Sequence, residues 1–288
     1  MKKLIFVLIL SMFSVFSVQG QLMEYGLGLG GSVYWGDMNA PDFGTNLGNT
    51  NFALQGVLKF NFNKSFAAKA NLLYGKLSGD DNRSFLEWQK QRNLNFTSPI
   101  FEFSVLGEWH IFGYNYGEEN PLSPYLTAGA GVIYFNPSTT IDGVSHDLQP
   151  LGTEGQGMAG FPAKYNRISV SLPFGAGVKF KASDVLNISI DVLSRKTFTD
   201  YIDDLSTNYV AFDELAAGNG LLSARLSNRI GEYLGQQEPV VLETGSQRGG
   251  ANVADYFFTG MVTFTFKLNR ELGLFGRGGR GSMDCPKF

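Results

Sequence analysis

The sequence is poor in the residues that build disulfide scaffolds and metal sites. It contains one cysteine, Cys285, and two histidines in 288 residues. A single cysteine excludes an internal disulfide, and so few Cys and His argue against a tetrahedral zinc site. Only 17% of the residues are charged and the formal net charge is −3, so the composition gives no electrostatic reason to expect nucleic-acid binding. We therefore expect no nucleic-acid partner, no metal and no cofactor.

Long apolar runs are scarce as well. Lys2 and Lys3 precede an apolar stretch over 4–18, and Gln19, Gly20 and Gln21 follow it. A stretch of 15 residues is shorter than the roughly 20 that a spanning helix needs, and the pattern is typical of a signal peptide. We predict a signal peptide over 1–20, cleaved after Gly20. Gln21 stands where a bacterial lipoprotein would carry its lipid-modified cysteine, and no later stretch reaches the length of a spanning helix.

The sequence is rich, in contrast, in segments that alternate with period two. Hydrophobic residues make up 43% of the chain and aromatic residues 14%. Between Phe52 and Phe62 every second residue is apolar or glycine, and Lys59 lies on the opposite face. Such alternation predicts a strand with one apolar face. The predicted strands, eight in all, cover 22–35, 52–62, 66–74, 101–111, 125–135, 168–180, 186–195 and 256–268.

Strand length and loop length favour a membrane barrel over a secreted two-sheet sandwich. Several strands alternate over ten or more residues, whereas soluble strands average about five or six residues and transmembrane strands need about nine to eleven. Short links at 63–65, 113–123 and 181–184 alternate with long links at 36–50, 78–98, 136–164 and 199–254. Residues 21–268 are therefore predicted to form an eight-stranded antiparallel up-and-down transmembrane β-barrel. Its short turns would face the periplasm, its long loops the exterior.

The longest loop is predicted to be partly helical. Leu222, Leu226, Ile230 and Leu234 recur every four residues, and Asn219 precedes them as a helix cap. The helix would cover the barrel mouth or dock a partner.

Charged residues on the inward faces predict a filled interior. A barrel of eight strands is just wide enough for side chains to fill it, so opposite charges would pair there and an open pore is not expected. These predicted lumen residues are Lys59, Lys69, Glu102, Glu108, Arg167, Lys179, Asp191, Arg195 and Lys267.

Few residues could carry catalysis. His110 lies on an inward strand face, and His146 lies in a loop beside Asp147. No serine stands in a recognisable nucleophile motif. We predict no enzymatic activity, with an outer-membrane hydrolase or lipid-modifying enzyme, or a small passive channel, as the alternatives. Asp200, Asp203 and Asp204 form an acidic cluster. Calcium takes such carboxylates, but the EF-hand spacing is missing, so rim stabilisation or partner contact is favoured.

The segment 269–288 is predicted to be a flexible, basic, periplasmic tail. It is rich in glycine and carries Arg277 and Arg280, a composition that does not bury a core. Cys285 would be a free thiol there or form an intermolecular disulfide.

Several segments resemble the PorG family of the type IX secretion apparatus. They are SVSLPFGAGVKF from Ser169, RKTFTDYIDDLSTNY from Arg195, PYLTAGAGVIYFNP from Pro124, QPLGTEGQG from Gln149 and the closing CPKF. The most specific part is the loop holding Thr197, Phe198, Asp200, Tyr201, Asp203 and Asp204. The resemblance implies an outer-membrane barrel without enzymatic activity that associates with a periplasmic ring of PorK and PorN. It also implies a role in exporting proteins with a C-terminal sorting domain and, in some species, in gliding motility. Under this resemblance, Arg277, Arg280 and Cys285 are expected to contribute to docking the ring.

Overall fold

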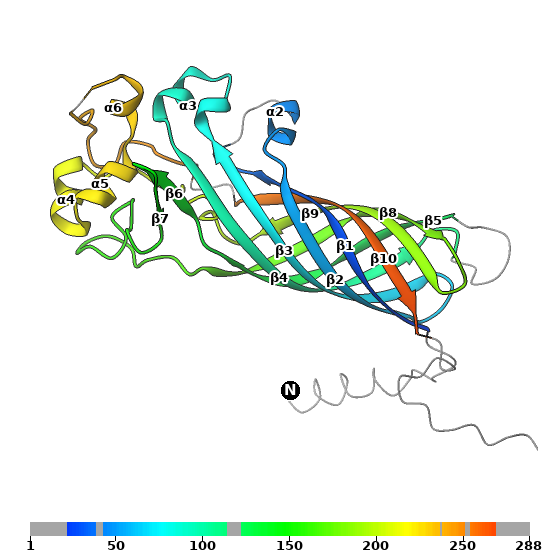
Figure 1. Cartoon of the computed structure of the whole chain (residues 1–288). Coiled ribbons are helices and arrows are strands. Elements are labelled where there is room, and N and C mark those ends of the chain that lie inside the picture. The colour runs from blue at the N-terminus through cyan, green and yellow to red at the C-terminus, as the bar shows by residue number, and fades with distance from the viewer. Residues whose placement is uncertain (1–21, 39–42, 114–121, 237, 251–253, 269–288) are drawn as a thin grey trace, which may run out of the picture.

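The chain forms a closed antiparallel β-barrel (Figure 1). The computed structural model describes residues 22–38, 43–113, 122–236, 238–250 and 254–268. Neighbours in the barrel follow the order β3-β2-β1-β10-β9-β8-β5-β4, and pairing of β3 with β4 closes it. The predicted eight-stranded up-and-down barrel is confirmed. The barrel strands are β1 (Leu22–Trp35), β2 (Asn51–Asn61), β3 (Phe66–Asp80), β4 (Asn95–His110), β5 (Leu122–Phe135), β8 (Ile168–Lys181), β9 (Leu186–Thr197) and β10 (Tyr256–Lys267).

The strands form because every second side chain turns outward. In β2, Phe52 and Leu54 are exposed, whereas Ala53, Gln55 and Val57 are buried. This pattern is the one predicted from the sequence, with the apolar side chains outside and the polar ones inside. Among the described residues, no helix has the length and apolar character needed to cross a membrane.

The two ends of the barrel differ. At one end, short turns join β2 to β3 and β8 to β9, and β1 begins and β10 ends there (Figure 1). Asn63 stabilises the first turn, because its Oδ1 accepts hydrogen bonds from the backbone N–H groups of Ser65 and Phe66, both at 2.8 Å. Ser183 does the same in the second turn, accepting from Val185 and Leu186. The long loops gather at the opposite end.

At the loop end, two strands run further than predicted. Strand β3 continues to Asp80 and β4 starts at Asn95, and these two residues pair in register, although 78–98 was predicted to be a loop. The outward positions there are Lys76, Ser78 and Asp80. Outside a bilayer the outward face meets water, so the apolar alternation that identifies a strand disappears while the backbone ladder continues. The connection between β3 and β4 contains η1 (Asp81–Arg83) and α3 (Glu87–Arg92).

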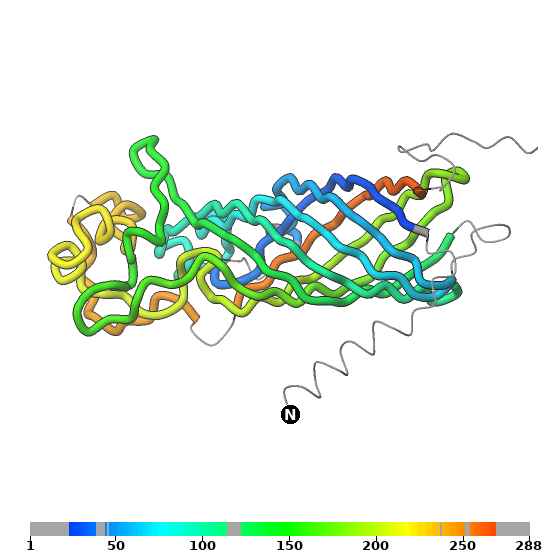
Figure 2. Tube along the Cα trace, turned by 90° about the horizontal axis from the view of Figure 1, so that it is seen from below, coloured from blue at the N-terminus to red at the C-terminus, as the bar shows by residue number. Residues whose placement is uncertain are grey.

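Short elements build a cap over the loop end. They are α2 (Phe43–Leu47), β6 (Ser138–Ile141), β7 (Val144–Asp147), α4 (Phe212–Asn219), α5 (Leu221–Ser227) and α6 (Ile230–Tyr233). Strands β6 and β7 form a hairpin whose turn has positive φ at Asp142 and Gly143, as a tight two-residue turn requires. Figure 2 shows this hairpin projecting from the cap.

The prediction of a partly helical loop is confirmed, but the single helix capped by Asn219 is wrong. Asn219 ends α4, and Gly220 has a φ of 94° that interrupts the helical path. The Asn219 amide instead donates to the backbone carbonyls of Gly152 and Gln156. The predicted signal peptide (1–20) and tail (269–288), with Arg277, Arg280 and Cys285, lie outside the described residues.

Candidate functional site: a filled lumen under a loop cap

The outer wall of the barrel is apolar. Leu27 and Leu72 are 65% and 63% exposed, and Val192 is 59% exposed. Among the described barrel strands, outward positions carry charge only at the loop end, at Lys76, Asp80 and Lys196. Placing Lys or Arg at the bilayer midplane costs about 2–4 kcal/mol, so this distribution is the one expected for a wall in contact with hydrocarbon.

The half of the lumen nearest the short turns is filled by buried ion pairs. Lys59 Nζ lies 2.6 Å from Glu108 Oε2, and Lys69 Nζ lies 3.3 Å from Glu108 Oε1. Lys69 also approaches Asp191, at 3.7 Å. These four residues are at most 3% exposed. They come from β2, β3, β4 and β9, so the network joins strands across the lumen.

Two further pairs extend the charged filling. Lys179 Nζ lies 2.7 Å from Glu24 Oε1, and Arg195 Nε lies 2.6 Å from Glu102 Oε2. Arg195 also donates to Thr259 Oγ1 at 2.6 Å. Glu24 was not among the predicted lumen residues, because the strand 22–35 has the weakest alternation. Its position opposite Lys59 in the strand register is known only once the strands are paired.

One predicted lumen residue, Arg167, lies outside the lumen, and another, Lys267, lies at its end. The guanidinium of Arg167 lies 5.7 Å from the centre of the outward-facing Tyr134 ring and donates to Asn136 Oδ1 at 2.9 Å. Arg167 therefore lies against the outer face of the rim, and its prediction as a lumen charge is wrong: it precedes β8, where the alternation of the strand no longer fixes side-chain direction. Lys267 faces inward at the short-turn end, the last residue of β10, and is 9% exposed.

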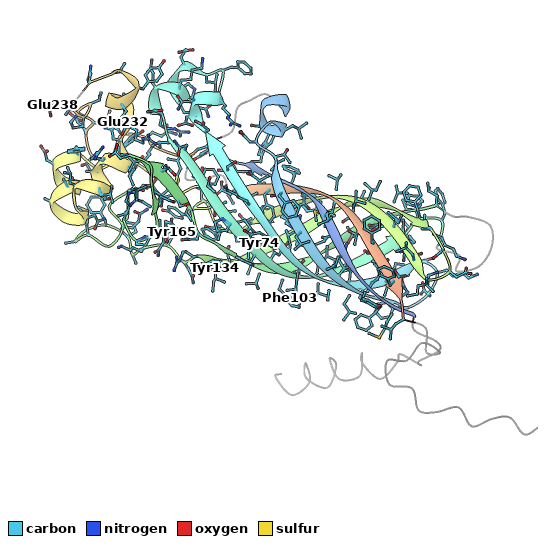
Figure 3. The ribbon with its side chains drawn as sticks, viewed as in Figure 1. Tyr74, Phe103, Tyr134, Tyr165, Glu232 and Glu238 are labelled. Carbon is cyan, nitrogen blue, oxygen red and sulfur yellow. The ribbon has the colours of Figure 1, made fainter. Side chains whose placement is uncertain are left out.

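The half of the lumen nearest the long loops is apolar, and a loop closes it. Ile202 and Leu205 are fully buried among barrel side chains that include Leu77, Phe135 and Phe257. Tyr201 stacks on Tyr165 with ring centres 4.4 Å apart, and Tyr165 stacks on Phe135 at 6.2 Å (Figure 3 labels Tyr165). The loop that carries the most specific part of the resemblance to the PorG family thus inserts into the barrel mouth.

Two carboxylates and a tyrosine hold this inserted loop. Tyr34 Oη lies 2.6 Å from Asp203 Oδ2 and 2.7 Å from Asp255 Oδ1. Each contact of this length needs a hydrogen, and a phenol supplies one, so one of the two carboxyl groups carries a proton. Asp255 also accepts from the Ile202 N–H, and Asp203 from the Leu205 N–H. The two acids therefore fix the backbone of the loop as well as its side chains.

A buried arginine joins this loop to the rest of the cap. Arg248 donates to Glu154 Oε1 at 2.9 Å and to the backbone carbonyl of Asp204 at 2.7 Å. Glu154 also accepts from the backbone N–H groups of Ser206 and Thr207, both at 3.0 Å. Sequence reasoning missed this pair, because neither residue belongs to a periodic segment, although Glu154 lies within the segment QPLGTEGQG.

Burial shifts the protonation of these acids. It raises the pKa of Asp203 and of Asp255 well above the ordinary value, and the nearby Asp255 charge adds to the effect on Asp203. Burial also raises the pKa of Asp204 to about 6 and that of Asp200 to about 7. For Asp204, the positive charge of Arg248 opposes the shift.

The remaining loop residues have separate positions. Thr197 Oγ1 donates to the backbone carbonyl of Asp255 at 2.6 Å, and Phe198 is exposed. Asp200 is half-buried, whereas Asp203 and Asp204 are fully buried. Of the two roles considered for the acidic cluster, Asp203 and Asp204 perform rim stabilisation, because they are inaccessible to a partner.

The two histidines lie in different surroundings in the part of the chain that the structure describes. His146 lies on β7, opposite Thr139 in the hairpin. His110 Nδ1 lies 3.0 Å from Ser123 Oγ inside the barrel, and its Nε2 lies 3.7 Å from Glu108. Within the described residues, no group of three or more Asp, Glu, His or Cys is arranged to hold a metal ion.

A family model described as a domain of unknown function (DUF6089) matches residues 2–224. The chain belongs to this family. No curated protein matches this chain.

Solved structures with a similar barrel come from several bacteria. One is Ail, the attachment invasion locus protein of Yersinia pestis, solved with the heparin analogue sucrose octasulfate. It is 11% identical, with a TM-score of 0.40, over 87% of this chain and 100% of that one. Neisserial surface protein A is 8% identical, with a TM-score of 0.39, over 85% and 97% of the two chains. The N-terminal barrel domain of Pseudomonas aeruginosa OprF is 9% identical, with a TM-score of 0.32, over 87% and 98%. At these identities the similarity concerns the barrel fold alone.

Proposed function

We propose that this chain is a non-enzymatic outer-membrane protein that anchors or adapts a periplasmic PorK/PorN-like ring of the type IX secretion machinery. The observation that carries the proposal is an apolar outer wall around a lumen filled with side chains. The filling is charged near the short turns and apolar near the loops. A barrel built in this way holds a position in the membrane, and its interior is occupied by its own side chains. The secretion role itself rests on the sequence resemblance of the loop 195–209 to the PorG family.

The filled lumen argues against a passive channel. The lower half contains paired charges and the upper half contains apolar side chains, with Ile202 and Leu205 inserted from the cap. Water and ions would have to displace both layers of side chains.

The surroundings of His146 argue against a hydrolase. A nucleophile and its base are expected within hydrogen-bond reach of each other. Strand β7 carries His146 and Asp147 on an exposed hairpin away from the barrel mouth. Exchanging both residues for alanine should leave the lipid composition of the membrane and secretion unchanged, and an altered lipid profile would favour the enzyme.

The asymmetry of the barrel supports an orientation with the C-terminus in the periplasm. The short turns lie at the same end of the barrel as the start of β1 and the end of β10. Short turns are periplasmic in outer-membrane barrels. The tail 269–288 then begins in the compartment that would contain the ring, and Arg277, Arg280 and Cys285 are its proposed docking residues.

Membrane residence and the secretion role are tested separately. Alkaline carbonate should leave the protein in the membrane pellet, and its release would contradict the barrel's position in lipid. Deleting the gene should abolish export of proteins bearing a C-terminal sorting domain. Normal export in the deletion strain would refute the secretion role and leave the membrane assignment intact.

The docking proposal is tested by truncation after Leu268. Ring proteins should be captured from solubilised membranes with the full chain and lost with the truncated chain. The matched control is Lys64→Ala, which changes a charge in the β2–β3 turn at the same end of the barrel. Equal recovery of the ring with and without the tail would overturn the docking proposal.

A further inference from the structure

Three aromatic side chains form a row on the outer wall. Tyr74 of β3, Phe101 of β4 and Tyr134 of β5 pair in register, all facing outward. Their ring centres are 4.9 Å apart between Tyr74 and Phe101 and 6.4 Å apart between Phe101 and Tyr134. Figure 3 labels Tyr74 and Tyr134 on the barrel wall. Aromatic girdles mark the boundary between hydrocarbon and headgroups in membrane barrels, so this row marks the boundary nearest the loops.

An apolar groove begins directly below the row. Its upper part, about 580 Å³, is lined by residues that include Tyr134, Val132, Phe103 and Leu72 (Figure 3 labels Phe103). Its lower part, about 740 Å³, shares Leu72 and Phe103 with the upper part and continues down the wall to Tyr25. The groove therefore runs from the headgroup boundary into the hydrocarbon region.

A glycine lines the groove where the two parts meet. Gly56 faces outward from β2 and borders both parts. A Cβ added at this glycine would meet nothing within 4 Å, so its missing side chain leaves open space. An acyl chain lying along the wall would fit against the glycine more closely than against the projecting leucines.

Two cations flank the upper end of the groove. Lys76 lies on the same face as Tyr74, two residues closer to the loops. Arg167 lies over the ring of Tyr134. Among the described residues, neither side chain is within 4.0 Å of a carboxylate in an ion pair. Strands β3, β4, β5 and β8 are neighbours, so three strand spacings, or about 14 Å, separate the backbones that carry the two cations.

We infer that this groove binds a lipid of the outer leaflet that bears two phosphate groups. One acyl chain would lie in the groove, and the phosphates would meet Lys76 and Arg167. Guanidinium and ammonium groups are the usual partners of phosphate, and two separated cations match two separated phosphates better than one. The inference rests on the proposed membrane location, because that location places the groove in hydrocarbon and the cations among headgroups.

The binding test uses the purified full chain in detergent, titrated with bis-phosphorylated lipid A and followed by native mass spectrometry. The double variant Lys76→Gln/Arg167→Gln should bind about 30-fold more weakly, since each cation near a lipid surface contributes about 1 kcal/mol and 1.4 kcal/mol is tenfold. The matched control is Lys196→Gln. Lys196 also faces outward at the loop end, but it lies on β9, opposite Tyr256 and away from the groove. Its exchange should leave binding unchanged.

A second pair of variants tests the groove itself. Gly56→Leu fills the open space and should weaken binding of the lipid, whereas Gly260→Leu should not. Gly260 faces outward from β10, does not line the groove, and a Cβ there also meets nothing within 4 Å. All variants should keep the folded gel mobility of the wild type, because the exchanged side chains lie on the outer wall.

The outcomes separate the lipid site from the proposed function. Equal affinity of the wild type for bis-phosphorylated lipid A and for its dephosphorylated form would overturn the phosphate assignment. Equal loss of binding in Gly56→Leu and Gly260→Leu would overturn the assignment of the lipid to the groove. Either result, with the protein retained in carbonate-washed membranes, would refute the lipid site alone, whereas release by carbonate would refute the membrane location on which the site depends.

Discussion

Exchange of Glu108 for glutamine removes the carboxylate that two buried lysines share. Lys59 lies 2.6 Å from one oxygen of Glu108 and Lys69 lies 3.3 Å from the other, and all three side chains are at most 4% exposed. Lys69 keeps a second acid, Asp191, at 3.7 Å. Lys59 is left without a carboxylate at ion-pair distance among the described residues, and its charge stays buried.

The expected cost follows from this loss of a partner. Removing one member of a buried ion pair destabilises a protein by about 3–5 kcal/mol, because an uncompensated charge remains inside. The matched control is Glu87→Gln on α3, where Glu87 pairs with Lys90 at 3.0 Å but the two side chains are 68% and 32% exposed. Exposed pairs contribute about 0–1 kcal/mol. Lys59→Met should cost less than Glu108→Gln, since Glu108 then keeps Lys69.

The free energy of unfolding is measured by urea titration of the barrel in lipid vesicles, with tryptophan fluorescence and gel mobility as independent probes. Glu108→Gln should lower it by at least about 2 kcal/mol more than Glu87→Gln does. Equal values for the two variants would mean that water reaches Glu108 and that the lumen is not packed, which would refute the reasoning.

Three further outcomes are expected. Leu205→Ala should cost about 2–5 kcal/mol and speed protease cleavage within 199–254 while the barrel stays folded; an unchanged cleavage rate would contradict insertion of the loop. Because the pKa of Asp204 is raised to about 6 and that of Asp200 to about 7, their contribution to cap stability is complete below their ordinary pKa of 3.8 and is lost as the pH rises to about 7. Cleavage should thus be slower at acidic than at neutral pH, and Asp200→Asn should reduce the difference, whereas a flat wild-type profile would oppose this account. Planar-bilayer recordings of the wild type should show no steady conductance, and a stable open level would disprove the sealed lumen.

Much of the barrel could be predicted from the sequence, because lipid and lumen impose opposite chemistry on alternate residues. The side chains of β2 alternate as expected, with Phe52 outside and Lys59 inside. The same rule correctly turns Glu102, Glu108 and Arg195 inward. It stops at the headgroups, where β3 continues through Lys76 and Asp80 although the outward face is polar.

The cap could not be predicted in the same way, because its contacts join residues far apart in the chain. Tyr34 meets Asp203 and Asp255, and Arg248 meets Glu154. No sequence pattern pairs these residues before the fold is known. The loop with Asp203 and Asp204 was singled out from resemblance, and the structure supplies a physical reason for its composition, since both acids hold backbone and side chains inside the mouth.

The lumen pairs also constrain how the wall can be assembled. Glu24 of β1 finds Lys179 only when β8 has arrived, and Glu102 of β4 finds Arg195 only with β9. Until then, Glu24 and Glu102 lack these cationic partners. Partly inserted intermediates are therefore penalised, and biogenesis should proceed as one concerted event in which β8 and β9 neutralise the charges that β1 and β4 carry.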